Sequence, residues 1–208
     1  MSMAWMRMPG QSWPGAASAF LGMWVVMMVA MMLPSVAPTL WRYRQSVGAR
    51  QTALVGVGYF FVWTMIGMAA FGLGVVLAAV EMRQPALARA VPIAAGVVVL
   101  VAGALQFTAW KAHHLACCRE SPGVHGTLPA SGAWRLGLKL GLHCGYRCAG
   151  LTAVVLVIGV MDLRAMAAVT TAITVERFAP AGDRAERVIG TAVVGTGLFM
   201  ILRAAGLG

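Results

Sequence analysis

The chain has 208 residues, of which 60% are hydrophobic and 11% are charged, whereas an ordinary soluble domain has about 45–50% apolar and about 25% charged residues. This composition excludes a water-soluble globule. The 16 Lys and Arg residues against 6 Asp and Glu give a net charge of +10, which in a soluble chain would suggest a nucleic-acid partner. Because the basic residues lie between long apolar blocks, we expect a polytopic membrane protein whose surroundings are the lipid bilayer, with no nucleic acid bound.

The apolar blocks predict about six transmembrane helices. A helix needs about 20 mostly apolar residues to cross a hydrocarbon core of about 30 Å. The expected spans lie near residues 18–40, 53–80, 91–110, 142–161, 163–178 and 188–207, within one membrane domain that takes in residues 1–208. The fifth is short and rich in Thr, so whether it crosses the whole membrane is left open. The predicted fold is all-α, a helical bundle in the membrane.

The basic residues also predict an orientation. With six spans, ten Lys and Arg residues fall in the loops after the first, third and fifth spans, five fall on the opposite side, and Arg147 lies within the fourth span. Cytoplasmic loops carry an excess of Lys and Arg. We therefore expect the bacterial inner (cytoplasmic) membrane with both termini in the periplasm. Many of the 25 glycines lie inside the spans, and small residues of this kind favour close helix packing in lipid.

All four cysteines and all four histidines lie between His113 and Cys148. Thiolate and imidazole ligands suit soft or borderline metals, so we expect copper(I), with zinc as the second choice. The alternatives are cysteines buried as small apolar side chains and a disulfide between Cys144 and Cys148, which a reducing cytosol disfavours. The candidate ligands in this part of the chain are His113, His114, Cys117, Cys118, His143, Cys144 and Cys148.

Methionines recur in the first span at helical spacing. Met23, Met27 and Met31 form one stripe, and Met28 with Met32 forms a neighbouring one. Thioethers are soft and uncharged, so the first stripe is a candidate copper(I) site that avoids a buried carboxylate. The alternative is that these side chains are adaptable packing. Two prolines follow at positions 34 and 38 and predict a bend that ends this span.

Several short motifs follow one another along roughly residues 20–200. They are Trp24-x-x-Met27, Ala30-Met31-Met32-x-Pro34-Ser35, Gln106-x-x-x-x-Lys111, Cys118-Arg119-x-Ser121-Pro122, Trp134-Arg135-x-Gly137, Cys148-x-Gly150, Gly159-Val160-Met161-x-Leu163 and Glu176-Arg177. On these motifs the chain resembles a bacterial family of predicted metal-binding integral membrane proteins, known as a domain of unknown function. The resemblance implies metal binding and no established reaction.

The chain departs from that family directly after Cys148. The family typically shows Gly-Cys-Cys there, and this chain reads Gly150-Leu151-Thr152. Two family thiols are therefore absent, and His143 and Cys144, which lie just upstream, can compensate for them.

Three classes of function compete on this sequence. We expect a membrane protein that binds a soft transition metal for transfer or delivery, with a metallochaperone or a larger membrane complex as partner. The alternative is a structural or assembly subunit of such a complex. An enzyme, either a thiol oxidoreductase or a haem protein, is not favoured, because the thiols lack C-x-x-C spacing and the histidines do not lie deep within facing spans.

Overall fold

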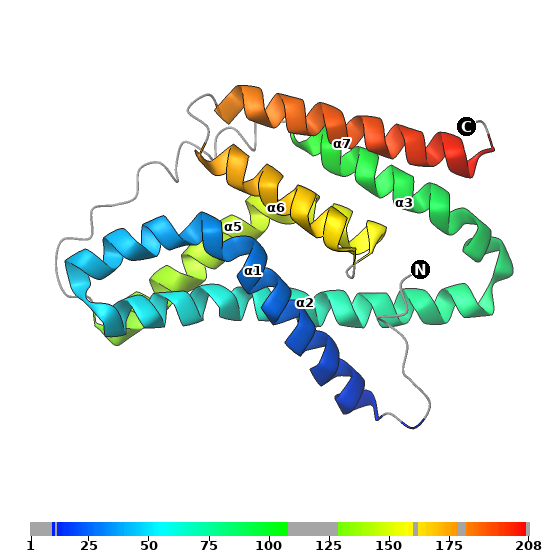
Figure 1. Ribbon diagram of the computed structural model, residues 1–208. Helices are drawn as coiled ribbons and strands as arrows, with labels where there is room; N and C mark the ends of the chain where they lie inside the picture. Colours follow the sequence, from blue (N-terminus) through cyan, green and yellow to red (C-terminus); the bar gives the residue numbers. More distant parts are fainter. Residues whose placement is uncertain (1–9, 11, 108–128, 160–161, 179–181, 207–208) are drawn as a thin grey trace. The chain divides into compact units, whose positions relative to one another are not determined.

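The computed structural model describes residues 10, 12–107, 129–159, 162–178 and 182–206. Within these residues the chain is helical and contains no strand, which confirms the all-α prediction. The helices, shown in Figure 1, are α1 (Trp13–Val47), α2 (Ala49–Arg83), α3 (Pro85–Leu105), α5 (Ala130–Ile158), α6 (Leu163–Phe178) and α7 (Gly182–Ala204).

Four stretches of helix are long and apolar enough to cross a membrane: Trp13–Val47, Ala49–Arg83, Ala130–Ile158 and Arg187–Ala204. Ala90–Leu105 is a shorter apolar stretch, and α6 has only 16 residues. Many large apolar side chains of these helices are exposed, including Val26, Leu73 and Phe199, as expected for helices surrounded by lipid. The length and composition of these helices fit a membrane protein, and the number of six spans stays a prediction.

The first helix extends beyond the predicted span at both ends. It begins after Ser12, whose side chain accepts a hydrogen bond from the Gly15 N–H at 3.3 Å and so caps the first turn. Pro34 and Pro38 lie inside the helix, and Figure 1 shows that α1 bends. The helix continues past the prolines to Val47, so they bend it without ending it, and the predicted end of the membrane span at this place stays a prediction. Each proline removes one backbone hydrogen bond, which bends a helix without necessarily breaking it.

Contacts along the chain define two compact units. The first, here called the α1 unit, holds α1, α2 up to Gly72 and α5 up to Arg147. The second, the α3 unit, holds α2 from Leu73, α3, α5 from Cys148, α6 and α7.

In the α1 unit, glycines bring the backbones of α2 and α5 together. A Cβ atom added at Gly58 would lie 2.9 Å from the Trp134 carbonyl oxygen, and one added at Gly141 would lie 2.9 Å from the Tyr59 carbonyl oxygen. Such distances leave no room for a side chain, which is how small residues act in helix pairs within lipid. This approach places Tyr59 of α2 beside the part of α5 that carries Cys144.

Helix α1 is joined to α2 through two tryptophans. The indole N–H of Trp24 donates a hydrogen bond to the Trp63 carbonyl oxygen at 2.9 Å. Gly67 makes room for this indole, because a Cβ there would lie 2.5 Å from Trp24 Nε1. The buried side of α1, which also carries methionines, is thereby held against α2.

The α3 unit is built around the pairing of α3 with α7, which lie side by side in Figure 1. A Cβ added at Gly103 would lie 2.7 Å from the Val194 backbone nitrogen, and one added at Gly197 would lie 2.6 Å from that of Leu100. At one end of α3, Gln106 Nε2 donates a hydrogen bond to Glu176 Oε1 of α6 at 3.2 Å, and both side chains are buried. The predicted close packing of glycine-bearing helices is thus present within the chain.

Candidate metal centre

Three of the seven predicted His and Cys ligands lie in α5, in the described part of the chain. They are His143, Cys144 and Cys148. His143 is exposed, whereas both cysteines are buried and neither forms a disulfide. The other four, His113, His114, Cys117 and Cys118, lie outside the described residues.

Cys144 contacts side chains from two other helices. The Tyr59 hydroxyl of α2 donates a hydrogen bond to Cys144 Sγ at 3.0 Å, and the Cys144 thiol donates toward the Met32 thioether sulfur of α1 at 3.9 Å. The side chains of Cys144, Tyr59 and Met32 are 8%, 1% and 0% exposed. All three belong to the α1 unit, and we call them the Cys144 cluster.

Local sequence features position each member of the Cys144 cluster. Gly141 lies one helical turn before Cys144 and permits the close approach of α5 to the Tyr59 backbone. On α1, the Ser35 hydroxyl donates a hydrogen bond to the Met32 carbonyl oxygen at 2.9 Å. This bond ties the Ser35 side chain to the helix backbone at Met32.

The two methionine stripes of α1 differ in their contact with the Cys144 thiol. Met27 and Met31 of the predicted stripe are buried, and Met23 is half-buried. The methionine that contacts the thiol, however, is Met32, which belongs to the second stripe. The sequence identified both stripes and offered Met23, Met27 and Met31 as ligands; whether these three bind metal stays a prediction, and the structure adds the contact of Met32 with the thiol.

The Cys144 cluster offers soft donors in an apolar setting. Within the described part of the chain, no group of three or more His, Cys, Asp or Glu side chains could hold a metal ion. A thiolate and a thioether are soft donors of the kind that suit copper(I) and zinc. A copper(I) ion and one thiolate also sum to zero charge, which reduces the cost of burial in lipid.

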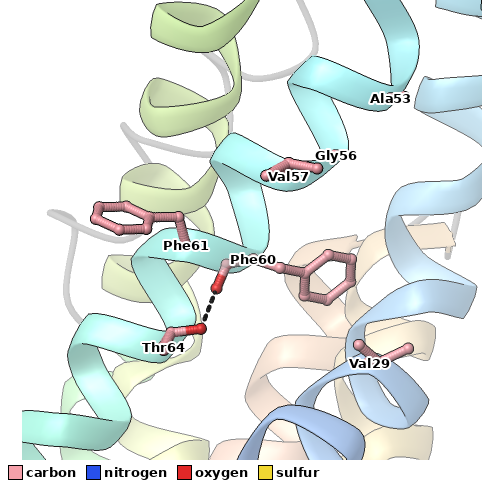
Figure 2. A pocket seen from close by; sticks show the side chains of 7 residues that line it. All are labelled: Val29, Ala53, Gly56, Val57, Phe60, Phe61 and Thr64. Atoms are coloured by element: carbon pink, nitrogen blue, oxygen red, sulfur yellow. Dashed lines mark hydrogen bonds between the residues drawn. The ribbon is translucent and has the colours of Figure 1, made fainter. Parts of the chain in front are cut away.

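A separate hollow of about 520 Å³ lies on α1 and α2. Figure 2 shows Val29 of α1 across from Phe60 of α2. The Thr64 hydroxyl, also in its lining, donates a hydrogen bond to the Phe60 carbonyl oxygen at 2.9 Å. The lining is apolar and contains no His, Cys or Met, so the hollow has no donors for a soft metal. Its lining residues are Val29, Ala53, Gly56, Val57, Phe60, Phe61 and Thr64.

The chain is similar to a known protein family. The model of the PpoB2 family, described as copper chaperones, matches residues 21–200. No curated protein and no solved structure matches the chain. The matched range contains Met32, Tyr59 and Cys144, and it supports the metal-related part of the resemblance seen in the sequence while pointing to copper. The chain therefore belongs to the PpoB2 family of copper chaperones.

Proposed function

We propose that this chain binds copper(I) as its cargo inside the membrane and delivers it to a recipient protein, with the Cys144 thiolate as the principal ligand. The observation that carries the proposal is the contact between two sulfur atoms from different helices, Cys144 Sγ and Met32 Sδ, at 3.9 Å in a buried setting. Soft sulfur ligands that converge from two elements are what a copper(I) site requires.

The charge of the site supports copper(I) over zinc. Metal binding displaces the thiol proton, after which copper(I) and one thiolate form a neutral pair. Zinc would leave one uncompensated positive charge, and its sites usually hold four N, O or S ligands. Because burial penalises uncompensated charge, the Cys144 cluster favours the monovalent ion.

Other predicted ligands extend this proposal. They act as transient ligands that copper(I) binds on its way to or from Cys144, because copper transfer proceeds by replacing one soft ligand with another. These residues are His113, His114, Cys117, Cys118, His143, Cys148, Met23, Met27 and Met31.

We also propose the setting in which delivery takes place. The chain lies in the bacterial inner membrane with periplasmic termini, and its recipient is a metallochaperone or a larger membrane complex. The distribution of Lys and Arg between the predicted loops supports this orientation through the excess of positive charge in cytoplasmic loops.

Metal analysis of the purified protein tests the proposal. The full chain is purified in detergent under anaerobic, reducing conditions, loaded with copper(I) and freed of excess metal. We expect bound copper in the unsubstituted protein and loss of most of it in Cys144→Ala. The matched control is Val154→Ala, which removes a buried apolar side chain from the same helix and should retain copper.

Two results would contradict the proposal. One is an unsubstituted protein that binds no copper(I), and the other is Cys144→Ala retaining as much copper as Val154→Ala. Native purification adds a further readout: a stable partner that itself holds all the copper would favour the assembly-subunit interpretation over copper carriage by this chain.

A further inference from the structure

The separation of the two sulfur atoms limits how copper(I) can bind between them. Metal–sulfur bonds are about 2.3 Å long, by analogy with zinc thiolates. A metal bonded equally to two sulfurs 3.9 Å apart would have an S–metal–S angle of about 115°, by the same bond length. A linear two-ligand site would need a separation of about 4.6 Å, twice that bond length. The bent arrangement leaves room for a third ligand.

The neighbours of Cys144 and Met32 restrict the identity of that ligand. The Tyr59 hydroxyl contacts Cys144 Sγ at 3.0 Å, but a neutral phenol oxygen is a poor ligand for a soft ion. Its hydrogen bond instead fixes the orientation of the sulfur. Within the α1 unit, the buried soft donors that remain are the other thioethers of α1. Cys148, one helical turn after Cys144, belongs to the α3 unit.

Helix geometry distinguishes among those thioethers. At 3.6 residues per turn, Met28 lies about 40° around the helix from Met32 and one turn along it. Met31 lies about 100° away from Met32 by the same geometry. Met28 is also buried, with 1% of its side chain exposed, and methionine has three rotatable bonds that allow its sulfur to reach a shared metal.

We infer that Met28 is the third ligand, so that Met28, Met32 and Cys144 form a buried three-sulfur copper(I) site in the α1 unit. This inference rests on the proposed function and specifies its donor set. Copper(I) replaces the thiol proton of Cys144, which leaves as H⁺, and no electron is transferred. Met32 and Met28 donate lone pairs without changing charge, so the completed site is neutral.

X-ray absorption at the copper edge tests the donor set in the copper-loaded full chain. We expect three sulfur ligands in the unsubstituted protein, two in Met28→Leu and three in the matched control Met31→Leu. Leucine approximates the volume of methionine, and cores usually tolerate such exchanges. In competition with a chromophoric copper(I) chelator, affinity should fall at least tenfold in Met28→Leu and stay within twofold in Met31→Leu.

A second measurement requires no substitution. When selenomethionine replaces methionine throughout the chain, we expect two selenium neighbours at copper. One or no selenium neighbour would overturn the assignment, as would unchanged coordination and affinity in Met28→Leu. If Cys144→Ala still abolishes copper binding, only the third ligand is refuted. If the unsubstituted protein binds no copper(I), the proposed function itself fails.

Discussion

The contact between α2 and α5 predicts a large effect of adding a single methyl group. In Gly141→Ala, the new Cβ would lie 2.9 Å from both the Tyr59 carbonyl oxygen and Val62 Cβ. Ordinary contact begins at 3.4 Å, so the atoms must separate by at least 0.5 Å, the difference between the two values. The obstructing atoms are a backbone oxygen and a Cβ, so the helices themselves must move. Overpacking of this kind costs about 1–3 kcal/mol.

Gly56→Ala is the matched control for this substitution. Gly56 lies in α2, and a Cβ there would meet nothing within 4 Å. Alanine in a helix interior is favoured over glycine by about 0.5–1 kcal/mol, so this variant should be as stable as the unsubstituted protein or more stable.

Thermal unfolding in detergent, combined with chelator competition, measures both consequences of Gly141→Ala. We expect a lower midpoint than for Gly56→Ala, and weaker copper(I) binding because Tyr59 and Cys144 no longer meet at 3.0 Å. Equal midpoints and equal copper affinities in the two alanine variants would refute the described packing of α5 against α2.

Two further substitutions probe single hydrogen bonds. Tyr59→Phe removes the hydroxyl that donates to Cys144. We expect a loss of about 0.5–1.5 kcal/mol in unfolding free energy and faster release of copper(I) to a chelator. Unchanged release would argue against a role of the hydroxyl in orienting the Cys144 sulfur. Trp24→Phe removes the indole donor to the Trp63 carbonyl oxygen and leaves a gap. It should lower the unfolding midpoint more than Trp41→Phe, a change at an exposed position. The opposite order of midpoints would contradict the described contact of α1 with α2.

The sequence determined the fold class and the class of ligand. High apolar content and sparse charge required membrane helices, because only a helix or a closed barrel satisfies its backbone hydrogen bonds in lipid. The helix α6, Leu163–Phe178, has the bounds predicted for the fifth span. Likewise, thiols, imidazoles and thioethers indicated a soft metal from their chemistry alone, and the family match to copper chaperones agrees with that interpretation.

The tertiary structure alone decided which of these donors meet. Met32 and Cys144 are 112 residues apart in sequence, and Tyr59 and Cys144 are 85 apart. Helices that are apolar on all sides carry little periodicity to show which face turns inward, so the sequence could not choose between the two methionine stripes. The glycine content predicted that helices pack closely, but not which helices pack against each other. The pairing of α2 with α5, and of α3 with α7, depends on which backbones can approach without a Cβ between them. The approach of α2 to α5 brings the Tyr59 hydroxyl within hydrogen-bonding distance of the Cys144 sulfur.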